Sequence, residues 1–354
     1  MSKKSRSDRP ASVSLGVPAG AGPDRSLVWL VLIIAFAAIL RLYALGTVPH
    51  GFTNDEAQDG LSARQAIDTG MQVFYPENNG REGLYVNISS LLIRMLGNTI
   101  WAMRLPAAVF GILTVWIIYL LGAVLFSKST GLWAALFTAA STWHLFNSRL
   151  TNRANLAPFF LSLALYLLFL AVRKVREGGT SLPWAISAGL IYGLGFHSYT
   201  SFRVTPALLL PLGVYSLLRA REEAWRRKLY VAASAFAAAC LLAIAPLAHY
   251  FSTHPGAFSG RVSQVSVWSH PNPAGQVLTN IWAVAQMFFL SGDTDWKNNI
   301  AGRRELFFPV AICFAAGLYC ALHAILKRRE GQAHRRFGYA LMLGWIVLGA
   351  FLPS

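Results

Sequence analysis

The chain has 354 residues, of which 55% are hydrophobic and only 13% are charged, and its formal net charge at pH 7 is +16. The charged share is about half that of an ordinary soluble domain, which argues against two soluble domains. In a soluble protein such positive charge would suggest a nucleic-acid partner, but in a membrane protein Lys and Arg mark cytoplasmic loops. The composition therefore indicates a polytopic membrane protein that binds no nucleic acid.

The first 26 residues are polar and rich in Ser, Pro and Gly, which predicts a disordered cytoplasmic tail. Residues 27–354 are predicted to form one transmembrane domain with about nine apolar segments, because about 20 residues cross a bilayer. The predicted spans are residues 27–45, 102–125, 131–147, 154–172, 182–197, 204–218, 229–250, 306–325 and 337–353.

The basic loops indicate how the chain is oriented. With the N-terminus in the cytoplasm, the runs RKVR, RAREEAWRRK and KRREGQAHRR all fall on the cytoplasmic side. The long loops 46–100 and 251–305 then face outward. We expect a multi-pass protein of the inner or plasma membrane with an extracytoplasmic active site.

The first outer loop is predicted to contain two helices that lie on the membrane surface. Residues 55–67 are good helix formers, and Gly70 is placed to end that helix. Residues 85–96 are apolar but contain Arg94, which argues against a span. The predicted fold class is an all-α membrane protein, a helical bundle with interfacial helices in its first outer loop.

Acidic residues are scarce in this chain, yet three lie together in the stretch GFTNDEAQDG, at Asp55, Glu56 and Asp59. A fourth, Glu82, follows in NGREGLY. A carboxylate at the membrane interface can act as a general base toward an acceptor hydroxyl, and a second can orient the substrate or hold a metal. The alternative interpretation is that these acids are merely solvated.

Outward-facing cations could bind a lipid phosphate, since the planar fork of Arg donates two parallel hydrogen bonds. Each of them could instead be a headgroup contact or a snorkelling side chain. These candidates are Arg149, Arg153, Arg203, Arg261, Lys297, Arg303 and Arg304.

Several segments share their pattern with one known group of enzymes. They are Asp55-Glu56 after the first span, Arg81-Glu82-Gly83-Leu84-Tyr85, GNTIWAMRLP at 97–106, Ser148-Arg149 with Arg153, GLGFHSYTSFRVTP at 193–206 with Tyr199 and Arg203, and Gly292-Asp293 with Asn298 or Asn299. With these segments the chain resembles the lipid-linked-sugar glycosyltransferases of the GT-C superfamily. In particular it resembles glycosyltransferase family 39, which holds the protein O-mannosyltransferases and the bacterial 4-amino-4-deoxyarabinose lipid A transferases.

The resemblance implies an inverting transfer of a monosaccharide from a polyprenyl-phosphate donor to a hydroxyl of a protein, lipid or glycan. It implies catalytic roles for Asp55 and its neighbour Glu56, with Asp55 taking the acceptor proton or orienting the acceptor. Glu82 would lie near the donor phosphate, through a divalent metal if one is used. No other cofactor is implied. The remaining substrate-binding candidates are Arg81, Tyr85, Arg149, Arg153, Tyr199, Arg203 and Asp293.

The chain departs from the family pattern at three points. Asn155 stands where an acid is common, Gly83 stands where Pro is usual, and the sequence stops at FLPS, where family members continue, so a C-terminally truncated domain is expected. Two other functions stay open. A transporter or flippase should carry polar residues within its spans and an inverted repeat, and neither is evident. A non-catalytic membrane scaffold would tolerate the departures.

Overall fold

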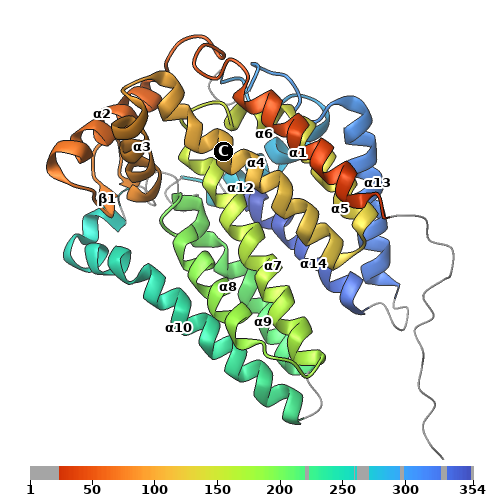
Figure 1. Ribbon diagram of the computed structural model, residues 1–354. Helices are drawn as coiled ribbons and strands as arrows, with labels where there is room; N and C mark the ends of the chain where they lie inside the picture. The colour runs from red at the N-terminus through yellow and green to blue at the C-terminus, as the bar shows by residue number, and fades with distance from the viewer. Residues whose placement is uncertain are drawn as a thin grey trace, which may run out of the picture.

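The computed structural model describes residues 24–219, 223–258, 260, 271–295, 299–327 and 333–351. Residues 1–23 of the predicted tail, and the candidates Arg261, Lys297 and Asn298, lie outside this part. The described chain is mainly helical, as predicted, with one short two-stranded sheet (Figure 1). Its elements are α1 (Ser26–Leu42), α2 (Asn54–Thr69), β1 (Phe74–Tyr75), β2 (Arg81–Glu82), α3 (Gly83–Leu96), α4 (Ile100–Leu125), α5 (Lys128–Ala140), α6 (Thr142–Asn147), η1 (Arg153–Asn155), α7 (Leu156–Arg176), α8 (Leu182–Gly195), η2 (Thr200–Val204), α9 (Pro206–Arg219), α10 (Glu223–Thr253), α12 (Pro273–Phe289), α13 (Phe308–Leu326) and α14 (Ala333–Phe351).

Four helical segments in the described residues are long and apolar enough to cross a membrane. They are Ile100–Leu125, Arg153–Arg176, Glu223–Thr253 and Phe308–Leu326. Shorter apolar helices include α1 and α8, so the count of nine spans stays a prediction.

Close packing between α8 and α10 depends on two glycines four residues apart in α8. A Cβ on Gly189 would overlap the Phe236 carbonyl oxygen, and a Cβ on Gly193 would lie 2.7 Å from the Cys240 carbonyl oxygen. Small residues at this spacing let helix backbones approach each other in membranes, where packing rather than the hydrophobic effect drives association. The α8–α10 pair thus forms one side of the bundle (Figure 1).

The first outer loop folds as predicted into two helices, with a short hairpin between them. Thr53 and Glu56 form a reciprocal capping box at the start of α2, and Gly70 ends it with φ +98°. The strands β1 and β2 pair antiparallel, with Phe74 opposite Glu82. Buried apolar residues of α2, β1, α3 and α4 form one cluster, so this loop is a packed subdomain at one end of the bundle (Figure 1).

Two α-helices were not predicted as separate elements. The expected span 131–147 breaks at Ser141 into α5 and α6, because Ser141 Oγ accepts the His144 backbone N–H and starts a new helix. Within the expected loop 251–305, residues Pro273–Phe289 form α12. Asn272 caps that helix and Pro273 occupies its first turn, both common features of helix starts.

Candidate active site

The carboxylate of Glu56 is held by a buried arginine from the next long helix. Arg104 Nε lies 2.8 Å from Glu56 Oε1, and its Nη2 lies 3.2 Å from Oε2. The Thr151 backbone N–H donates to Oε1, and the Thr53 backbone N–H donates to Oε2. Glu56 is 1% exposed and Arg104 is 1% exposed. This ion pair ties the start of α2 to α4 and to the turn before η1.

The hydrogen bonds of Glu56 also fix its protonation state. Burial alone would raise its pKa, but the Arg104 guanidinium and the backbone N–H groups of Thr151 and Thr53 outweigh that effect. The pKa of Glu56 therefore lies below its ordinary value, and the group is a carboxylate at neutral pH. Both of its oxygens already accept hydrogen bonds from Arg104 or from backbone N–H groups. Glu56 is therefore suited to hold the start of α2 in place.

Asp55 differs from its neighbour in being partly exposed. It lies in the first turn of α2, and its Oδ1 accepts a hydrogen bond of 3.3 Å from the exposed Asn78 side chain. The helix N-terminus favours the carboxylate form of a residue placed there. Asp55 therefore combines access from outside with a fixed position.

Asp59 lies one helical turn after Asp55 and is paired with Arg81 of β2. The Arg81 guanidinium bonds Asp59 Oδ1, and its Nη2 donates to Ser62 Oγ at 2.7 Å. Asp59 and Arg81 are almost completely buried. Arg81 thus joins the hairpin to α2. The same contacts occupy two nitrogens of its guanidinium, the group that was predicted to bind substrate.

Glu82, the next residue, is bonded to η2 and not to α2. Its Oε1 accepts hydrogen bonds from Arg203 Nη2 at 2.9 Å and Thr200 Oγ1 at 3.2 Å, both from η2. Its side chain is fully buried, and its Oε2 is a buried oxygen with no hydrogen-bond partner among the described residues. Gly83 makes this position possible, because a Cβ there would overlap the Gln72 carbonyl oxygen, and its N–H donates to the Val73 carbonyl. The Gly83 departure therefore fits this hairpin, which a Pro would clash with.

Aromatic rings lie beside two arginines, Arg203 and Arg153. The Arg203 guanidinium lies 4.8 Å from the Phe251 ring centroid and 5.1 Å from that of Phe258. Arg153 lies 5.5 Å from the Tyr199 ring centroid, and its Nη1 is buried without a hydrogen-bond partner in the described structure. A cation over an aromatic face is stabilised and held in place. The Arg203 contact with Phe251 brings the C-terminal end of α10 against η2, and the Phe251 ring centroid also lies 5.2 Å from that of Phe74 in β1.

Three other predicted positions have mainly structural contacts. Arg149 donates to the backbone carbonyls of Leu40, Tyr43 and Val48, and so caps the end of α1. Tyr85 is fully buried and donates to the Met103 carbonyl. Asn155, at the position where an acid is common, is buried and donates to the Ala107 carbonyl at 2.8 Å.

Asp293 lies in the turn between α12 and α13. Its Oδ1 accepts the Asp295 backbone N–H, and its carbonyl accepts the Gly302 N–H. Burial raises the pKa of the nearby Glu305 to about 7, with the Asp293 charge contributing and the Asp293 backbone hydrogen bond opposing. This turn therefore brings two acidic residues together, of which the sequence analysis named only Asp293.

The described residues do not form a metal site. No group of three or more His, Cys, Asp or Glu side chains within the described ranges could hold a metal ion. Glu82, the candidate ligand, is paired with the guanidinium of Arg203 instead. A cation beside the carboxylate disfavours a second cation there, so the side chains around Glu82 do not fit a divalent metal.

Sequence reasoning missed the partners of the acids. Arg104, Ser62 and Thr200 were not expected to contribute. Arg104 had a signal, because it is a charged residue within a predicted span and belongs to the Arg-Leu-Pro pattern. Ser62 and Thr200 had none, since only the fold brings them to Arg81 and Glu82.

Residues 85–252 match the family described as dolichyl-phosphate-mannose-protein mannosyltransferase. A 125-residue stretch is 34% identical to YkcB of Bacillus subtilis (strain 168), a protein named as a candidate mannosyltransferase; the match covers 35% of this chain and 16% of that protein.

Two groups of solved structures share the fold. An oligosaccharyltransferase, AglB, from Archaeoglobus fulgidus in complex with an inhibitory peptide and a dolichol-phosphate has a TM-score of 0.59 and 15% identity. That match covers 92% of this chain and 48% of AglB. ArnT from Cupriavidus metallidurans bound to undecaprenyl phosphate has a TM-score of 0.51 and 16% identity, over 91% of this chain and 59% of ArnT. The chain thus spans about half the length of these structures.

These comparisons confirm the expected resemblance to the GT-C superfamily and the predicted fold class. They also agree with the apolar helices that the structure contains. The chain shares the fold of these solved structures, and its long apolar helices indicate an integral membrane protein.

Proposed function

We propose that this protein is a glycosyltransferase that moves a monosaccharide from a polyprenyl-phosphate donor to a hydroxyl acceptor. Residues 85–252 match a family whose description names dolichyl-phosphate-mannose. The AglB structure named above contains a dolichol-phosphate, and the ArnT structure contains undecaprenyl phosphate. A lipid-phosphate donor also suits a chain in which we found no nucleotide-binding motif, because the donor itself carries the activated sugar.

The single observation that carries the mechanism is how the acids of α2 divide their roles. Glu56 and Asp59 are buried against Arg104 and Arg81, whereas Asp55 is partly exposed at the start of the helix. We therefore assign the base to Asp55 and an anchoring role to Glu56. A general base must reach the acceptor hydroxyl, and the exposed position of Asp55 permits that.

The reaction follows from this assignment. The acceptor oxygen attacks the anomeric carbon of the sugar, and Asp55 takes the proton of the acceptor hydroxyl. The bond between the anomeric carbon and the phosphate oxygen breaks, and its electron pair leaves with the polyprenyl phosphate. One bond forms as one breaks, so the configuration at the anomeric carbon inverts.

Arg153 and Arg203 supply the positive charge that the leaving phosphate needs. Arg153 has a buried guanidinium nitrogen without a hydrogen-bond partner in the described structure, and Tyr199 holds it by its ring. Arg203 is oriented by Glu82 and by the rings of Phe251 and Phe258. Preorganised donors aimed at developing charge lower the barrier most where water is scarce. We assign phosphate binding to Arg153 and Arg203, and the positioning of Arg203 to Glu82.

The site is proposed to face the outside of the cell. The runs RKVR and KRREGQAHRR would then lie in the cytoplasm, on the other side from α2 and α3. This orientation can be tested in intact cells with the variant Ser252→Cys, since Ser252 is exposed at the end of α10. We expect a membrane-impermeant cysteine reagent to label this variant and not the native chain.

The test is transfer of label by the purified protein in lipid nanodiscs. Polyprenyl-phosphate sugars labelled in the sugar are supplied with crude envelope acceptors, and the native chain is compared with Asp55→Asn. The matched control is Asp68→Asn, an exposed acid at the other end of the same helix. We expect label transfer that Asp55→Asn abolishes and Asp68→Asn leaves intact. Donor binding without turnover in any variant would favour a non-catalytic relative, and absence of donor binding would favour a transporter of another substrate.

A further inference from the structure

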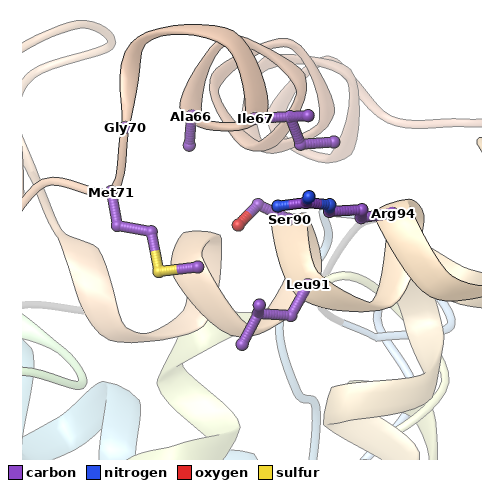
Figure 2. Close-up of a pocket in the computed structure, with 7 residues that line it drawn as sticks. All are labelled: Ala66, Ile67, Gly70, Met71, Ser90, Leu91 and Arg94. Carbon is purple, nitrogen blue, oxygen red and sulfur yellow. The ribbon is translucent and has the colours of Figure 1, made fainter.

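A groove between α2 and α3 lies apart from the acids and arginines described above. Its volume is about 220 Å³, and its walls are the C-terminal half of α2 and the C-terminal half of α3. Figure 2 shows Met71 and Leu91 at one side, and the Arg94 guanidinium between the two helices beside Ser90. The groove therefore has apolar walls and one cation.

Arg94 is not neutralised within the described part of the protein. Its side chain makes none of the salt bridges or side-chain hydrogen bonds found among the described residues. Ser90 cannot serve as a donor in its place, because its hydroxyl donates to the Asn87 carbonyl at 2.8 Å. A guanidinium stays charged at any physiological pH, so this groove has a permanent positive charge.

The surface around Arg94 is unusually apolar for a helix pair outside the bundle. Met71 is 53% exposed, Leu91 47% and Met95 76%, and Leu96 and Ile67 are also exposed. The opposite face of α3, with Val86 and Ile93, packs into the loop cluster, so α3 is apolar on both sides. Helices with such surfaces lie at the boundary between lipid headgroups and acyl chains.

We propose that this groove binds an anionic phospholipid of the bilayer, with the lipid phosphate on Arg94 and an acyl chain along Met71 and Leu91. Arg binds phosphate through two parallel N–H bonds, and the exposed apolar side chains match an acyl chain. The net positive charge of the groove favours a headgroup with net negative charge over a zwitterionic one. Such a lipid would brace the far ends of the two helices whose starts hold Asp55 and Glu82.

The experiment measures lipid retention by native mass spectrometry. Protein is released from phosphatidylcholine nanodiscs prepared with or without phosphatidylglycerol, and the bound lipids are counted. The variants are Arg94→Gln and Arg94→Lys. The matched control is Arg64→Gln, an exposed arginine on α2 that does not line the groove.

We expect Arg94→Gln to bind phosphatidylglycerol about tenfold more weakly, the loss that a charge-assisted hydrogen bond of about 1.5 kcal/mol gives. Arg94→Lys should retain part of the binding, and Arg64→Gln should bind as the native chain does. Equal retention by Arg94→Gln and Arg64→Gln would overturn the proposal, as would equal retention of phosphatidylcholine and phosphatidylglycerol by the native chain. Displacement of the lipid by millimolar inorganic phosphate would point to a site for a free anion instead.

Discussion

Replacing Arg104 with Met tests the ion pair that fixes the start of α2. The change removes the guanidinium from both oxygens of Glu56 and from the carbonyls of Pro49 and Gly51, which it bonds at 2.9 Å. Glu56 is 1% exposed, so its carboxylate would stay buried without its counter-charge. Removing one partner of a buried pair costs about 3–5 kcal/mol, and we expect about 3 kcal/mol because two backbone N–H donors to Glu56 remain.

Equilibrium unfolding in mixed micelles would measure this cost in a double-mutant cycle with Glu56→Gln. The double variant should lose less stability than the sum of the single variants, by about 1 kcal/mol or more, since both changes remove the same contact. The control is Lys128→Met, which breaks the exposed pair with Asp24 and should cost less than about 1 kcal/mol. If Arg104→Met costs no more than Lys128→Met, or if the single effects add, Glu56 is not anchored as described.

Three further predictions concern other parts of the described structure. Gly83→Ala should lower the midpoint of thermal unfolding because its Cβ would overlap a carbonyl, while Gly213→Ala, which has open space around it, should not; equal midpoints would refute the overlap. Glu305 has a pKa raised from 4.5 to about 7 by burial, so the folded state holds a proton that the unfolded chain releases, and stability should fall as pH rises between these values. Unfolding midpoints measured against pH should lose this slope in Glu305→Gln, and an unchanged slope would contradict the assignment. Arg41→Met removes donors to the last carbonyls of α5, so amide exchange over residues 142–151 should speed up; unchanged exchange would mean that Arg41 does not hold this turn.

The local elements of the first outer loop could be predicted from sequence. Good helix formers from Asp55, a glycine at position 70 and an apolar run that contains Arg94 predicted α2 and α3, and both helices are present. Most apolar segments likewise became helices near their predicted bounds. These features depend on neighbours in the chain, which a sequence displays directly.

The two α-helices that sequence reasoning missed, α6 and α12, depend on local capping. The break at Ser141 rests on one hydroxyl and on Arg41, which lies about one hundred residues earlier in the chain and bonds the Ala139 carbonyl. The helix α12 starts at Pro273, capped by Asn272, in a stretch that was predicted to be part of a long loop. Hydropathy alone does not distinguish a broken span from a continuous one.

Four of the predicted substrate-binding residues form two contacts in the structure, and their roles stay predictions. Glu82 accepts a hydrogen bond from Arg203, and the Arg153 guanidinium lies over the ring of Tyr199. Arg81, however, is paired with a buried acid of α2. A sequence shows that acids and arginines are present, but which arginine pairs with which acid follows from tertiary packing.

The anomeric configuration of the product tests the proposed mechanism most directly. The purified protein in nanodiscs would be given a polyprenyl-phosphate sugar of known configuration and an acceptor identified by label transfer, and the product would be examined by proton NMR. A single displacement by a hydroxyl that Asp55 deprotonates predicts the inverted configuration. A product that keeps the donor's configuration would contradict the account, because it would require a covalent intermediate on the enzyme.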